Sequence, residues 1–116
     1  MNPIIWVAST RKDLCEFPEP VRDHLGYALY QAQCGGRHRD TKTLRGFGGG
    51  GVVEVVSDFR GDTFRAVYTV RFANAVYVLH VFQKKSKSGR ETPQREIELI
   101  RQRLRDAELM AKESTT

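Results

Sequence analysis

The chain has 116 residues, of which 40% are hydrophobic and 28% charged, and its formal net charge is +5. This length allows one modest core and excludes two domains, and the composition excludes a disordered chain. No apolar run approaches the ~20 residues of a membrane-spanning helix, and the start, MNPIIWVAST, lacks the features of a secretory signal. We therefore expect a single cytoplasmic domain over residues 1–112, with a frayed tail at 113–116, and no membrane partner.

The positive charge is concentrated in one segment. From Lys84 to Arg105 the sequence has eight basic and three acidic residues, so this segment carries +5 and the remainder is close to neutral. A local positive field favours a binding site for an anionic partner, such as RNA, DNA, an acidic protein or a membrane surface.

The first third of the chain predicts one strand and two helices. Residues 3–8, PIIWVA, form an apolar run that predicts a strand. Thr10 opens a short helix that ends near Phe17. Pro20 is well placed in the first turn of a longer helix, which the glycines at 35–36 end.

Residues 37–51, RHRDTKTLRGFGGGG, are basic and rich in glycine. The segment does not match GxxxxGK[ST] and no helix follows it, so a phosphate-cradling loop is the weaker interpretation. The favoured interpretation is a flexible connection, with Leu44 and Phe47 packed on the core.

The second half predicts a meander of three strands followed by a helix. The strands are expected at 52–56, 64–72 and 75–82, with a turn at 58–62 in which Gly61 supplies a positive φ. In the third strand, alternation predicts one shared face for a set of five residues: Val76, Val78, His80, Phe82 and Lys84. Thr92 and Pro93 predict the start of a helix that runs toward Ala111. The order β-α-α-β-β-β-α predicts an α+β domain, a mainly antiparallel sheet with helices packed on one face.

Metal and nucleophilic chemistry have no recognisable motif in this sequence. His24, His38 and His80 lie in a helix, a loop and a strand, without HExxH or Cys/His pairing, so we expect no metal and no cofactor. There is no GxSxG, and Cys15 and Cys34 are expected to be reduced thiols.

Arg65, His80 and the lysines at 84–85 are the remaining candidates for chemistry. Each has an ordinary structural explanation, as an ion-paired strand arginine, a hydrogen-bonded core histidine or a solvated charge run. If they converge on a groove, they suit cleavage of RNA without a metal, in which the 2′-hydroxyl is the nucleophile. Clustered lysines lower one another's pKa, and an arginine can fork onto phosphate oxygens. The same residues could equally bind RNA without cutting it.

The ordered set KTLRGFG, GVVEVV, TFRAVYTVRF and VYVLHVFQKKSKSGRETPQREIELIRQRL resembles the RelE/HigB toxin superfamily, most closely its phage-derived HigB-like branch. The resemblance extends from about Ile4 to Arg105. It implies a RelE-like fold and a metal-independent, ribosome-dependent mRNA endoribonuclease that inhibits translation. It also implies a cognate antitoxin, often a helix-turn-helix DNA-binding protein. The alternative function is a non-catalytic RNA- or ribosome-binding module of phage origin.

The resemblance also implies roles for individual residues. Arg65 matches the strand arginine that contacts the scissile phosphate, and Lys85 matches a basic catalytic residue, with Lys84 adjacent and His80 proposed as a proton carrier. Arg45 and Lys87 match basic positions that contact RNA or the ribosome, and Lys42 and Arg71 are two further residues that we expect to bind RNA. Glu54 stands where RelE has a lysine. It could serve as an acid or base, but an ion pair with Arg65 is the favoured role.

Overall fold

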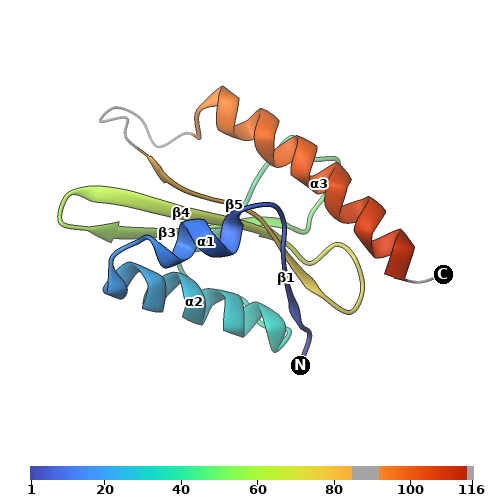
Figure 1. The fold of residues 1–116 in the computed structure, drawn as a ribbon, viewed down its shortest axis with the longest axis horizontal. Helices are drawn as coiled ribbons and strands as arrows, with labels where there is room; N and C mark the ends of the chain where they lie inside the picture. Colours follow the sequence, from blue (N-terminus) through green and yellow to red (C-terminus); the bar gives the residue numbers. More distant parts are fainter. Residues whose placement is uncertain (85–91, 115–116) are drawn as a thin grey trace.

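The computed structural model describes residues 1–84 and 92–114 (Figure 1). Along these residues the elements are β1 (Ile4–Trp6), α1 (Thr10–Cys15), α2 (Glu19–Gln33), β2 (Thr41–Thr43), β3 (Val52–Phe59), β4 (Asp62–Thr69), β5 (Val76–Lys84) and α3 (Gln94–Ser114). The expected α+β class is confirmed. The basic loop contains one strand that the sequence did not predict, β2, and α3 continues into the expected tail as far as Ser114. None of the described helices has the length and apolarity needed to cross a membrane.

The strands form one five-stranded sheet in the order β1-β5-β4-β3-β2. β1 pairs with β5 in parallel, and the other neighbours are antiparallel, so the sheet is mixed but mainly antiparallel as predicted. The hairpin of β3 and β4 turns at Arg60 and Gly61, whose φ angles are 51° and 85°. Positive φ at both positions matches the right-handed twist of the two strands, which explains the tight turn.

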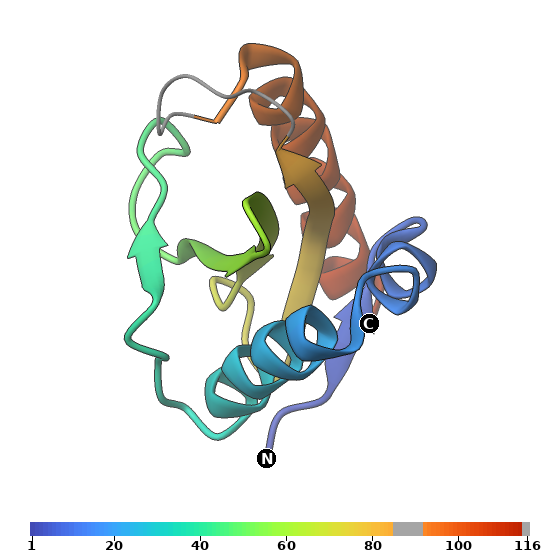
Figure 2. The same cartoon turned by 90° about the vertical axis from the view of Figure 1, so that its left-hand side faces the viewer.

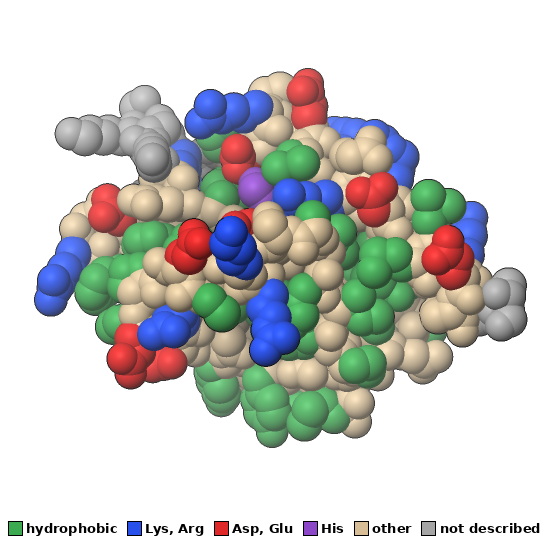
Figure 3. Space-filling view, in the orientation of Figure 1, with side chains coloured by type: hydrophobic (Ala, Val, Ile, Leu, Met, Phe, Trp, Pro, Cys, Tyr) green, Lys and Arg blue, Asp and Glu red, His purple; other side chains and the backbone are tan. Residues whose placement is uncertain are grey.

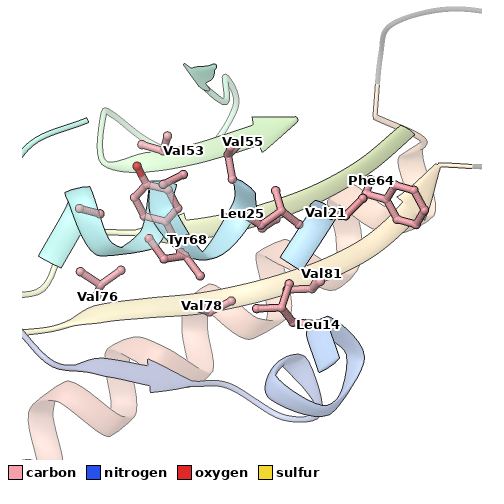
Figure 4. Close-up of a cluster of buried hydrophobic side chains, with 14 residues drawn as sticks. Leu14, Val21, Leu25, Val53, Val55, Phe64, Tyr68, Val76, Val78 and Val81 are labelled. Atoms are coloured by element: carbon pink, nitrogen blue, oxygen red, sulfur yellow. The ribbon is translucent and has the colours of Figure 1, made fainter. Parts of the chain in front are cut away.

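The helices cover both faces of the sheet, and the prediction that they share one face is wrong. α1 and α2 lie on one side, where Leu14 and Leu25 pack against Val53, Val55 and Tyr68 (Figures 1 and 4). α3 lies on the other side and contributes a second cluster with three buried residues: Ile100, Leu104 and Ala107. Figure 2 shows α3 and α2 on opposite sides of β5. The physical reason is that β5 is apolar on both faces, with Val76, Val78 and Val81 in one cluster and Tyr77 and Leu79 in the other, so both faces must be covered.

A β-bulge in β5 changes which residues share a face. Tyr68 of β4 pairs with Val78, whereas Val67 pairs with His80, so Leu79 is an extra residue on β5. Val78 packs in the core beneath α2, while Leu79 packs beneath α3. The predicted single face for Val76, Val78, His80, Phe82 and Lys84 is therefore wrong, because an extra residue shifts the alternation of side chains. The bulge directs His80 toward α3.

Candidate nucleic-acid site

Arg65 and Glu54 form a buried ion pair on the α3 side of the sheet. Arg65 Nη1 donates to Glu54 Oε1 at 2.8 Å, and the side chains are 6% and 0% exposed. Arg65 pairs in register with Val56, two residues beyond Glu54, so the two charged side chains meet diagonally across β3 and β4. The favoured role of Glu54, an ion pair with Arg65, is confirmed.

Thr92 and Lys42 extend this pair toward the surface. Thr92 Oγ1 donates to Glu54 Oε2 at 2.9 Å, and Arg65 Nη1 lies 3.4 Å from the same hydroxyl. Lys42 pairs in register with Glu54 across β2 and β3, which brings its Nζ to 3.6 Å from Glu54 Oε1. The Lys42 side chain is 53% exposed, so it joins the buried carboxylate to solvent. The unpredicted strand β2 is what places this lysine.

A cavity of about 390 Å³ lies directly beside this network. Its lining comes from β2, the segment after it and the start of α3: Lys42, Thr43, Leu44, Arg45, Thr92 and Ile97. Lys42 and Arg45 are exposed, whereas Leu44 is buried. Two cations at a concave surface with an apolar floor suit a phosphate and an adjoining base or sugar. The structure thus brings together Lys42, Arg45 and Arg65.

His80 is held by two charged residues of α3. Its Nε2 lies 2.6 Å from Glu96 Oε2, and Arg103 Nη1 lies 3.2 Å from Nδ1. Because a guanidinium only donates, Nδ1 accepts, and Nε2 carries the hydrogen that bonds Glu96. Burial lowers the pKa of His80, the Arg103 charge lowers it further, and Glu96 opposes both. His80 is consequently a neutral, doubly bonded histidine, and its ring stacks on Phe82 with centroids 4.5 Å apart.

Comparison with known protein families identifies the family of this chain. A family profile described as Phage derived protein Gp49-like (DUF891) matches residues 12–105. The chain belongs to this family. The Gp49-like family is related to the RelE-like toxins. Searches of curated proteins and of solved structures found no match.

Of the three lysines predicted to act at the end of β5 in this Gp49-like chain, Lys84 is the one that lies within the described residues. Lys84 is the last residue of β5 and is only 8% exposed. It pairs in register with Thr63, at the end of the hairpin beyond the pairing of Arg65 with Phe82. Lys85 and Lys87 lie outside the described residues, so their roles stay predictions. Lys84 is therefore near Arg65 along the sheet but largely covered.

Arg71, predicted to bind RNA, contacts the glycine-rich loop of the Gp49-like chain. Its Nη2 donates to Phe47 O at 2.7 Å and to Gly50 O at 3.1 Å. From α3, Arg101 donates to Gly46 O at 2.8 Å and lies over the Phe47 ring. Leu44 and Phe47 are buried, as expected, but the loop is held by two arginines instead of being a loose connection. Arg71 lies just beyond the end of β4, whereas Arg65 lies in the middle of that strand.

Sequence reasoning missed one member of the network, Thr92, which was assigned only as a helix cap. Its hydroxyl bonds a carboxylate 38 residues earlier in the sequence, and no local pattern indicates such a contact.

On the face seen in Figure 3, Lys and Arg side chains alternate with Asp and Glu. On that face of the Gp49-like chain, the described residues thus form no single continuous basic patch. The candidate site is a local cavity beside a buried charge pair.

Proposed function

We propose that this chain is the toxin of a type II toxin–antitoxin pair, a metal-independent endoribonuclease that cleaves mRNA on the ribosome and inhibits translation in the cytoplasm. The observation that carries the proposal is the cavity with Lys42 and Arg45 in its wall, next to the buried pair of Arg65 and Glu54. Membership of a family related to RelE-like toxins supports it.

The proposed chemistry starts from the RNA itself. The 2′-hydroxyl attacks the adjacent phosphorus, and the 5′-oxygen of the next nucleotide leaves, so negative charge grows on the phosphate oxygens. Lys42 and Arg45 bind the phosphate from the cavity wall and offset the growing charge, and the Arg65 guanidinium, which is paired with Glu54, lies next to the cavity behind Thr92. Lys85 is the proposed group for proton transfer, on the basis of the sequence resemblance alone.

Arg65 needs a local rearrangement to touch the phosphate. Its side chain is only 6% exposed, and the Thr92 hydroxyl lies against both Arg65 and Glu54. A phosphate that displaces the Thr92 hydroxyl would gain a bond to Arg65 Nη1, the same nitrogen that donates to Glu54. Arg65 would therefore both contact the substrate and stabilise the fold.

A non-catalytic RNA- or ribosome-binding module is the second candidate. It is favoured by His80, whose two ring nitrogens are both bonded to α3 side chains and which is therefore poorly placed to move a proton. It is also favoured by the burial of Arg65 and Lys84. Lys42 and Arg45 serve binding equally well with or without cleavage.

Induced expression in bacteria, with growth and mRNA integrity followed together, separates the two candidates. The toxin should arrest growth and produce new 5′ ends in mRNA by primer extension. Lys42→Ala combined with Arg45→Ala should relieve the arrest, and Lys85→Ala should abolish the new 5′ ends. Lys12→Ala, which removes an exposed lysine on α1, is the matched control and should arrest growth like the parent.

Each alternative outcome has a definite meaning. Arrest with intact mRNA, and with the protein on polysomes, would favour the binding module. Arrest that survives both the cavity variant and Lys85→Ala would reject the proposed site. Arg65→Ala is less informative alone, because it also breaks a buried ion pair, so its folding has to be checked by circular dichroism.

The toxin proposal also includes a partner. The expected antitoxin is a small protein, in many cases with a helix-turn-helix, encoded in the neighbouring reading frame. Co-expression of that frame should restore growth, and the two proteins should co-purify. Failure of every neighbouring frame to do so would count against a toxin–antitoxin pair, while leaving RNA binding open to the assays above.

A further inference from the structure

Two histidines and an aspartate meet on the α2 side of the sheet, on the face opposite the candidate nucleic-acid site. His24 projects from α2, and His38 and Asp40 come from the segment before β2. One donor atom from each residue lies within 4.8 Å of the other two. The sequence predicted no metal site because His24 and His38 lie in different elements without a recognised spacing. Folding of this segment against α2 brings them together.

The donor atoms are close to the separations that a tetrahedral metal needs. His24 Nε2 lies 2.9 Å from Asp40 Oδ2, and His38 Nδ1 lies 3.7 Å from the same oxygen. Bonds of 2.0–2.2 Å to nitrogen and oxygen imply ligand separations of roughly 3.3 Å in a tetrahedral zinc site. The two observed separations lie on either side of that value, so side-chain adjustments of a few tenths of an ångström would bring the donors into place.

A buried hydroxyl supports the orientation of His24. Ser57 of β3 is 3% exposed, and its Oγ lies 2.8 Å from His24 Nδ1. When Nδ1 carries the hydrogen and donates to Ser57, the Nε2 lone pair faces Asp40 and is available to a metal. Metal-binding histidines almost always have such a partner on the second ring nitrogen. This contact distinguishes the cluster from a chance meeting of surface residues.

We propose that His24, His38 and Asp40 bind a divalent transition metal, with Zn²⁺ the best match to the donor set. Two imidazoles and one carboxylate favour such a metal over Ca²⁺ or Mg²⁺, which prefer oxygen donors. The side chains are 29%, 13% and 44% exposed, so solvent reaches the cluster and a water can complete the fourth position. His38 Nδ1 accepts from the Asp40 amide, and the metal replaces that donor.

Binding at this cluster would brace the strand that carries Lys42. Asp40 immediately precedes β2, and the metal would tie this point of the chain to α2. The cluster thus has a structural role: it joins the edge of the sheet to the helix that covers it. This inference does not depend on the proposed toxin activity, because none of the three metal-binding residues lines the candidate nucleic-acid cavity.

Metal titration of the tag-free, chelator-treated full chain tests the proposal. Zn²⁺ should bind with one-to-one stoichiometry by calorimetry and raise Tm by about 10 °C at a hundredfold excess over Kd. Co²⁺ should produce the intense visible absorption of a tetrahedral site. Asp40→Asn and His24→Gln should each weaken Zn²⁺ binding at least about 100-fold, and Ser57→Ala about 10-fold.

Asp23→Asn is the matched control, because Asp23 is an exposed acid next to His24 that is not part of the cluster. It should bind Zn²⁺ like the parent. Asp40 is partly exposed, so Asp40→Asn keeps the test valid if His24→Gln fails to fold. The proposal is wrong if the parent binds no Zn²⁺ at 100-fold molar excess. It is also wrong if Asp40→Asn binds as tightly as Asp23→Asn.

Discussion

Arg65 and Glu54 meet diagonally across β3 and β4, with Nη1 and Oε1 2.8 Å apart and the carboxylate wholly buried. Neither charge is stable alone at this depth, because desolvation of an unpaired ion costs several kcal/mol. Thr92 bonds the second carboxylate oxygen, so the segment that leads into α3 is joined to the same pair. The pair therefore links the stability of the sheet to the site above it.

Removal of one partner of this pair should be strongly destabilising. Glu54→Gln leaves the Arg65 charge buried without its counter-ion, and the free energy of unfolding should fall by about 3–5 kcal/mol. Urea denaturation followed by circular dichroism measures the change. Glu98→Gln, an exposed acid on α3, should change stability by less than about 0.5 kcal/mol. A similar loss in both variants would contradict the structural role assigned to Glu54.

The double variant Glu54→Leu with Arg65→Met should be more stable than either single variant. It removes both charges and replaces them with apolar side chains, so no buried ion is left unpaired. The same denaturation series provides the comparison. If the two losses simply add, the residues do not act as a pair.

Lys42 and Arg45 should contribute more to RNA affinity than to the stability of the fold, because both side chains are exposed. Replacing either residue by Ala should weaken binding of a single-stranded RNA several-fold and lower the slope of log K against log salt by about 0.7. Fluorescence anisotropy at several KCl concentrations measures both quantities. Lys12→Ala on α1 should leave the slope unchanged. An equal effect of Lys12→Ala would mean that binding is diffuse and not centred on the cavity.

His80 should make the fold sensitive to mild acid. Its pKa is lowered by burial, so between that value and the ordinary value near 6.5 the unfolded chain binds more protons than the folded chain. The free energy of unfolding should then fall as the pH drops below about 6.5. His80→Gln should show a shallower decline over the same range. Parallel stability curves for the two proteins would contradict the assignment of a neutral, buried His80.

Arg71 should hold the glycine-rich loop. Arg71→Ala removes the hydrogen bonds to Phe47 O and Gly50 O. The free energy of unfolding should fall by roughly 1 kcal/mol, since the guanidinium is partly exposed. Amide hydrogen exchange should quicken in residues 46–51 while β4 stays protected. Arg11→Ala on α1 should leave that exchange unchanged. RNA affinity should fall far less in Arg71→Ala than in Lys42→Ala if Arg71 is mainly structural.

The sequence by itself determined the local elements and one pairing within the site. The apolar spacing of α2, the turn at Arg60 and Gly61, and the α+β class all follow from local periodicity and turn chemistry. The ion pair of Glu54 with Arg65 was also predictable, because adjacent strands of a hairpin bring residues 11 apart together.

Only the tertiary structure decided which residues share a face. One extra residue, Leu79, turns His80 toward α3, and α3 itself covers the face opposite α2. Thr92 forms a hydrogen bond with Glu54, and His24 forms one with Asp40, although the partners in each pair come from different elements of the chain. Side-chain alternation is a local property, but register, bulges and the choice of sheet face depend on how the whole core is filled.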